Sequence, residues 1–121
     1  MNNATATRME AACSLLAESE RRYLLYELAT HSGANLEEVV GQIAAWEHDD
    51  DQTQVDDETR QRVYVSLVHN HLPRLADYGI IEYDLRSGDI VLDDGFDDIK
   101  PLLNQFKQTE DDPTLRRLSS L

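Results

Sequence analysis

The chain has 121 residues, with 24 acidic side chains against 11 Lys and Arg, a formal net charge of -13 and an isoelectric point near 4.4. This length fits one domain with a single core, which argues against a large catalytic cleft between domains. No segment has the ~18 apolar residues that cross a bilayer, and the start MNNATATRME lacks the apolar run of a signal peptide. We therefore expect a cytoplasmic protein without a membrane partner.

The N-terminal part of the sequence shows two apolar helical faces in succession. Met9, Cys13 and Leu16 lie at helical spacing, and after the polar stretch AESE a second apolar face follows in RRYLLYEL. These patterns predict two consecutive helices, or one bent helix, ending at HSGAN. Cys13 is the one cysteine, so it cannot form an internal disulfide, and its apolar neighbours predict a buried position.

The next segment, NLEEVVGQIAAWE, carries the clearest helical pattern of the sequence. Leu36, Val39 and Ile43 lie at i, i+3 and i+7, and Asn35 directly before them is a typical N-cap. The acidic run over residues 47–58 has almost no apolar residue and no glycine. We expect this run to be a solvated loop rather than a calcium site.

A long apolar stripe from Thr59 to Tyr78 predicts one long helix. Gly79 then stands where a glycine commonly closes a helix through a left-handed conformation. Inside the helix, Pro73 lacks a backbone N–H, and its ring clashes with the carbonyl four residues back. We expect a kink or a helix break near residues 69–72.

After this glycine the apolar period falls from about four to two. IIEYDL alternates, RSGD has the composition of a turn and IVL is a second short strand, so residues 80–92 predict a hairpin. Helical spacing returns from Phe96 to Phe106, with Pro101 as a kink or a late start. The polar tail from Gln108 ends in TLRRLSSL, which predicts either a short docked helix or no regular structure.

The predicted elements follow the order of a winged helix-turn-helix domain. Helices come first, then a long helix that stops at a glycine, and a hairpin comes directly after it. The stretch HNHLPRLADYGIIEYD resembles the end of the recognition helix and the start of the wing in ArsR/MarR-like transcription regulators. Together with ERRYLLYELA and LEEVVGQIAAWE, it resembles an uncharacterised winged-helix family common in haloarchaea. The resemblance covers about Ser19 to Leu92 and implies a mostly α fold with a small β-hairpin (α+β).

The chain is divided accordingly into a winged helix-turn-helix domain with extra N- and C-terminal helices. Residues 1–18 are an N-terminal helical extension, residues 19–93 the domain itself, residues 94–107 a C-terminal helix and residues 108–121 a polar tail. The two flanking helices carry apolar residues outside the compact winged-helix core, so we expect them to form a homodimer interface. The expected dimerisation residues are Met9, Cys13, Leu16, Phe96, Ile99, Leu103 and Phe106.

The resemblance implies that the long helix and the wing bind double-stranded DNA. Arginine and asparagine can pair with guanine and adenine edges, while serine and histidine can contact bases or phosphates. From residue 60 to residue 86 four arginines stand against three acids, a balance of +1, so the rest of the chain carries -14. The candidate DNA contacts are Arg60, Arg62, Ser66, His69, Asn70, Arg74 and, in the turn of the hairpin, Arg86. The alternative is an ordinary solvated face.

The acidity of the chain also bears on where it works. Lys100 and Lys107 are the only lysines, and a lysine-poor, Asp-rich composition resembles that of proteins from salt-loving organisms. At ~1 M salt, charges are screened over ~3 Å, so the net charge need not repel DNA at long range. We expect bound salt cations at the acidic surface.

No catalytic constellation, cofactor motif or small-molecule substrate site stands out, and we do not expect an enzyme. His69 and His71, two apart, point to different helix faces, so we expect no metal site. The leading hypothesis is a sequence-specific transcription regulator of a halophilic archaeon that binds DNA as a homodimer. The alternative is a winged-helix protein-interaction module with an acidic surface that does not bind DNA.

Overall fold

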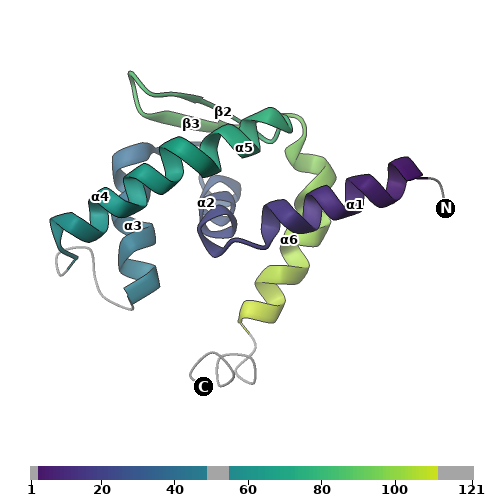
Figure 1. Cartoon of the computed structure of the whole chain (residues 1–121), viewed down its shortest axis with the longest axis horizontal. Helices are drawn as coiled ribbons and strands as arrows, with labels where there is room; N and C mark the ends of the chain where they lie inside the picture. Colours follow the sequence, from purple (N-terminus) through teal and green to yellow (C-terminus); the bar gives the residue numbers. More distant parts are fainter. Residues whose placement is uncertain (1–2, 49–54, 112–121) are drawn as a thin grey trace.

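Figure 1 shows the chain in the computed structural model, in which residues 3–48 and 55–111 are described. The elements are α1 (Asn3–Leu16), α2 (Ser19–Thr30), β1 (Ala34–Asn35), α3 (Leu36–His48), α4 (Asp57–Ser66), a π-helical turn η1 (Leu67–His71), α5 (Leu72–Asp77), β2 (Ile81–Asp84), β3 (Asp89–Leu92) and α6 (Phe96–Glu110). The TLRRLSSL pattern lies outside the described residues. Within the described ranges, no helix is long and apolar enough to span a membrane.

The three strands form one antiparallel sheet in the order β1-β3-β2. Ala34 of β1 and Tyr83 of β2 both lie opposite Ile90 of β3, and the β2–β3 hairpin projects from the body as a wing (Figure 1). The prediction of a mostly helical α+β fold with a winged-helix-like layout is confirmed. The strand β1 was not predicted, because two residues are too few to show an alternating pattern.

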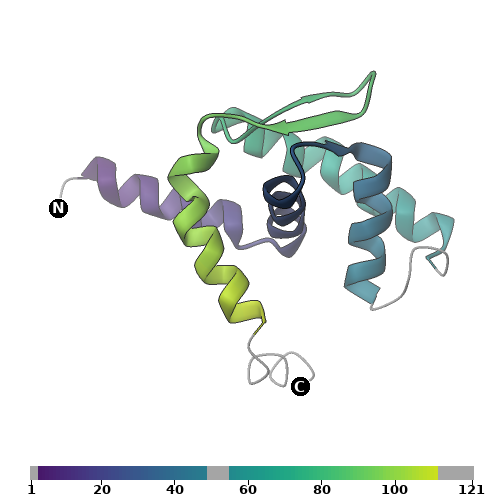
Figure 2. The same cartoon turned by 180° about the vertical axis from the view of Figure 1, so that it is seen from behind.

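The core is built around α2, which lies between α3 and α6 (Figure 2). Its leucines Leu24, Leu25 and Leu28 are at most 1% exposed, and they belong to one apolar cluster with Ile43 of α3 and Leu75 of α5. Burying a side chain of this size contributes ~1.5 to 3 kcal/mol. The apolar stripes that predicted the helices are therefore also the surfaces that hold them together.

The helix α4, the π-turn η1 and α5 run on as one rod across the front of Figure 1. The expected disturbance near residues 69–72 takes the form of the wide turn η1 rather than a break. Because Pro73 has no N–H to give to the carbonyl four residues back, a wider turn accommodates its ring. The N–H of Leu72 instead donates to the carbonyl of Leu67, five residues back.

Two glycines shape the junction between the rod, the hairpin and α6. Gly79 has a φ of 72°, and its N–H donates to the carbonyl of Ala76 at 2.9 Å while Ile80 N–H donates to Leu75 at 3.0 Å, as in a Schellman cap. The predicted glycine stop is confirmed. Gly95 lies against this turn, with its N–H donating to the Gly79 carbonyl at 2.8 Å. A Cβ on Gly95 would stand 2.6 Å from that oxygen, so the close approach requires glycine.

Three predicted boundaries are corrected. The helix α3 includes Glu47, as its sequence pattern predicts, and runs on to His48, so the predicted loop does not begin at residue 47; α4 begins at Asp57 rather than at Thr59. The reason is that Asp56 caps α4: its Oδ1 accepts the Thr59 N–H at 2.8 Å, and acids in a first turn favour the helix dipole. The last helix extends to residue 110 and contains Pro101 in its interior, so the proline is not a late start.

Candidate nucleic-acid interface and the polar cluster beneath it

The exposed face of the α4–η1–α5 rod carries most of the candidate DNA contacts. Arg62, His69, Asn70 and Arg74 are all exposed. The Asn70 Oδ1 accepts a hydrogen bond from Arg74 Nε at 3.2 Å, which holds the two side chains side by side. The opposite side of the rod is buried in the core, so this face is the one the fold presents outward.

Two other candidates on the rod are placed differently. Ser66 is half-buried, and its Oγ lies 3.0 Å from Nε2 of His71, so its side chain points inward rather than toward Asn70. In an α-helix residues five apart lie about 140° apart around the axis, but the wide π-turn brings them onto one face. Arg60 is half-buried and, with Tyr64, lines a hollow between α4 and the start of α3.

The wing adds an exposed cation at the tip of the hairpin. Arg86 is exposed there, and its backbone N–H donates to Oδ1 of Asp84 at 2.8 Å. The turn is fixed to the start of α3, because the Leu36 N–H donates to the Gly88 carbonyl at 2.7 Å. Gly88 has a φ of 79°, which favours glycine at this corner.

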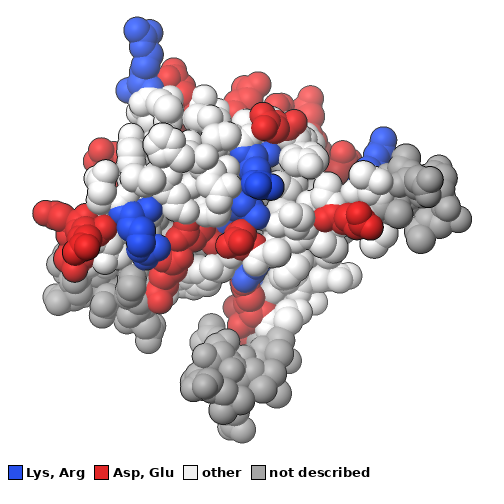
Figure 3. All heavy atoms as spheres, in the orientation of Figure 1, with Lys and Arg blue, Asp and Glu red and all other residues white. Residues whose placement is uncertain are grey.

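The surface around these cations is not basic throughout. Figure 3 shows blue atoms at separate places on the long helix and at the wing tip, with red atoms close to each. The first turn of α3 carries Glu37 and Glu38, and that of α4 carries Asp57 and Glu58. Helix N-termini ordinarily attract phosphates, so these acids oppose the use of either N-terminus as a phosphate site.

Beneath the rod lies a polar cluster that the sequence did not reveal. Glu20, Arg21 and His71 are 8%, 4% and 3% exposed. His71 Nδ1 lies 3.1 Å from Arg21 Nη1, and His71 Nε2 lies 3.0 Å from Glu20 Oε1. Because arginine can only donate, Nδ1 must be the acceptor, and the ring proton on Nε2 faces the Glu20 carboxylate. Arg21 also donates to the carbonyls of Leu15 at 2.6 Å and Ser14 at 3.0 Å at the end of α1.

The cluster fixes the ionisation of two carboxyl groups. Burial alone raises the pKa of Glu20, but hydrogen bonds with His71, Glu47 and Ser66 outweigh it and lower this pKa to about 2. Burial raises the pKa of Glu47 to about 7, and interactions with Glu20 raise it as well. The nearby Arg62 acts in the other direction and lowers this pKa. Arg62 Nη2 lies 3.4 Å from Glu47 Oε2. A candidate DNA contact is thus paired with the buried cluster.

One signal in the sequence pointed to the buried histidine. His71 lies four residues after Leu67 and four before Leu75, in the apolar stripe, whereas His69 lies outside it and is exposed. The prediction that the two histidines face different sides of the helix is confirmed. Nothing comparable marked Glu20 or Glu47, which lie in ordinary polar stretches. Among the described residues no group of three or more His, Cys, Asp or Glu is placed to hold a metal ion.

Four of the expected dimerisation residues lie in the core of a single chain, which corrects the prediction that they form a surface outside it. The structure buries Leu16, Phe96, Ile99 and Leu103 within a single chain, each at most 6% exposed, so they do not lie outside the core. The half-buried Phe106 packs under Arg22, whose guanidinium lies 5.1 Å from its ring centroid. The helix α6 also binds α2 through Glu110, which pairs with Arg22 and accepts from Tyr26 Oη at 2.8 Å.

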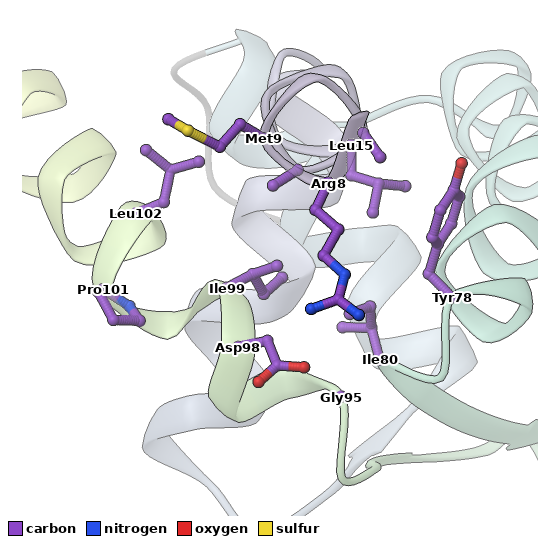
Figure 4. A pocket seen from close by; sticks show the side chains of 12 residues that line it. Arg8, Met9, Leu15, Tyr78, Ile80, Gly95, Asp98, Ile99, Pro101 and Leu102 are labelled. Atoms are coloured by element: carbon purple, nitrogen blue, oxygen red, sulfur yellow. The ribbon is translucent and has the colours of Figure 1, made fainter. Parts of the chain in front are cut away.

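A groove of about 650 Å³ stays open between α1, α6 and the end of the rod. Met9 and Tyr78 border it and are 60% and 55% exposed. Cys13 is also exposed, contrary to the expected buried position. Figure 4 shows Arg8 extending from α1 across the groove, toward Asp98 on α6.

The family model of a domain of unknown function, DUF7344, matches residues 13–91. The chain therefore belongs to this family, and the matched range runs from the end of α1 to the wing. The chain has no match among the curated proteins and none among the solved structures.

Proposed function

We propose that this member of the DUF7344 family is a sequence-specific DNA-binding regulator, akin to the ArsR/MarR-like proteins, from a halophilic archaeon. One observation carries the proposal: an exposed row of Arg62, Asn70 and Arg74 lies on the outer face of a long helix whose other side is core, in a fold with a wing. In winged helix-turn-helix proteins this helix enters the major groove. The rod α4–η1–α5 is thus the proposed recognition helix.

The residues of this face have distinct proposed roles. Arg62 and Asn70 read base edges by paired hydrogen bonds, and Arg74 supports Asn70 through its 3.2 Å bond. Arg86 at the wing tip contacts phosphate. The acids near these cations hold salt cations at the interface, so cations are both taken up and released on binding. Affinity therefore changes little, or rises, between moderate and molar KCl, unlike that of a basic repressor.

We propose that two copies pair through the groove between α1 and α6. One helix in one groove rarely gives enough affinity, and a two-fold interface must be self-complementary. The groove meets this need with an apolar edge at Met9 and Tyr78 and opposite charges at Arg8 and Asp98. Light scattering tests this pairing: the wild type is a dimer at micromolar concentration and Met9→Glu is a monomer. A monomeric wild type would remove the pairing.

Binding measurements on single variants test the recognition face. Arg62→Ala and Asn70→Ala each weaken binding to a specific duplex by ~1 to 3 kcal/mol, with the melting temperature nearly unchanged. Gln105→Ala, exposed on α6, is the control and leaves affinity unchanged. Equal affinity of all four proteins would refute the assignment of this face.

The second candidate is a protein-interaction module, and a specific observation favours it. The first turns of α3 and α4 are acidic, and Tyr64, which is 38% exposed, lines one hollow with Glu37 and Asp57. An exposed aromatic ring next to acids fits a basic protein segment. A protein that binds no duplex at any salt concentration but binds a basic peptide, with loss on Tyr64→Asp, would favour this candidate.

A further inference from the structure

The last turn of α3 places a carboxyl group between the exposed recognition face and the buried cluster. The Glu47 side chain is 21% exposed, pairs with Arg62 at 3.4 Å and lies close enough to Glu20 for each carboxyl group to shift the pKa of the other. Glu20 in turn meets His71 Nε2 at 3.0 Å. A continuous chain of contacts therefore runs from Arg62, on the proposed DNA-reading face, to the histidine beneath it.

Each helix that packs around this carboxyl contributes a charged or titratable group. Glu20 and Arg21 come from α2, Arg62 from α4 and His71 from η1. Glu18 and Arg74 act on Arg21 from farther away. Arg62 is the cation in direct contact with Glu47, and its side chain is 57% exposed, so it has room to turn outward.

Two neighbouring carboxylates repel each other, so the ionisation of one raises the pKa of the other. Glu20 is the ionised member, since it accepts from His71 and from Ser66. Glu47 is the member that holds the proton, with a pKa of about 7, and Arg62 is the group that favours its ionised form. The proton on Glu47 and the position of Arg62 therefore depend on each other.

We propose that Glu47 is a positioning residue for Arg62, and that DNA binding by Arg62 is linked to uptake of one proton by the Glu20–Glu47 carboxyl pair. When Arg62 turns from Glu47 to the DNA, Glu47 loses its counter-ion at the moment when phosphate charge approaches. The uptake of a proton then removes the uncompensated charge. The inference rests on the proposed function, because it requires Arg62 to contact DNA.

The sign of the pH dependence is set by this exchange. Loss of Arg62 and approach of DNA both raise the pKa of Glu47 above its value of about 7 in the free protein. Below that pH, free and bound forms are both protonated and affinity is flat. Above it, only the complex holds the proton, so affinity falls by up to about tenfold per pH unit.

Binding of a selected duplex between about pH 6 and pH 8 tests the link. Wild type loses affinity up to about tenfold from pH 7 to pH 8. Glu47→Gln keeps the hydrogen-bonding shape without a titratable proton, so it lacks the part of the affinity loss that Glu47 causes in the wild type. Glu38→Gln, on an exposed position of the same helix, is the matched control and retains the wild-type slope. Any contribution from the exposed His69 is the same in all three proteins.

A second readout does not need DNA. The carboxyl carbon of Glu47, followed by NMR, titrates near neutral pH in the free wild type and at higher pH in Arg62→Ala. An equal titration in both proteins, or a wild-type slope in Glu47→Gln, overturns the proton link while the proposed function stands. Absence of duplex binding at every pH overturns the proposed function and the link with it.

Discussion

Replacing His71 with alanine is the most informative perturbation of the fold, because this side chain joins the α4–η1–α5 rod to α2. His71 is 3% exposed and is the partner of both Arg21 Nη1 and Glu20 Oε1. Removing it leaves a buried guanidinium and a buried carboxylate each short of a hydrogen bond. Breaking a buried charged network by removing one member costs ~3 to 5 kcal/mol. We expect His71→Ala to lower the free energy of unfolding by this amount.

Urea denaturation followed by circular dichroism measures this loss, with His69→Ala as the matched control. His69 lies two residues away on the same π-turn and is exposed, so its replacement changes stability by less than ~0.5 kcal/mol. DNA binding gives the opposite contrast, because His69→Ala loses affinity for DNA although its stability is unchanged. Equal stability of the two variants would refute our account of the cluster.

Three further predictions concern stability. Leu67→Ala costs ~2 to 5 kcal/mol by denaturation, because this leucine is 0% exposed, whereas Gln61→Ala on the surface costs almost nothing. Gly95→Ala lowers the melting temperature, because its Cβ meets a carbonyl at 2.6 Å; Gly33→Ala, with 3.5 Å, is tolerated. The pKa of Glu47 is raised to about 7 in the folded protein, so its protonated carboxyl group adds to the stability of the fold. This contribution is complete below pH 4.5 and is lost as the pH rises through about 7. Denaturation of Glu47→Gln at several pH values should show no such loss.

Much of the fold could be predicted from periodicity. The stripe through Leu67 and Leu75, the glycine stop and the change to alternation after it were enough to predict the long helix and the wing. The helix ends at Gly79 for a local reason, because a residue that tolerates a positive φ is needed to close the helix in this way. Such features can be predicted because they depend on neighbours in sequence.

The features that escaped prediction depend on residues far apart in sequence. The spacing of Ser66 predicts a place on the polar face, but Pro73 widens the helix and turns that serine toward His71. Glu20 and His71 are 51 residues apart, and no local pattern pairs them. The stripe on the last helix predicts a dimer surface, although it covers the core of its own chain. An amphipathic pattern shows that a face is buried but does not show against what.

Selection of random DNA duplexes in molar potassium salt, followed by sequencing, tests the central claim most directly. The wild type should enrich a palindromic motif, because two copies would place two recognition helices on one duplex. The double variant Arg62→Ala, Asn70→Ala, which alters exposed side chains alone, should enrich no motif. Failure of the wild type to enrich any sequence, or the same motif from both proteins, would contradict DNA reading by this helix.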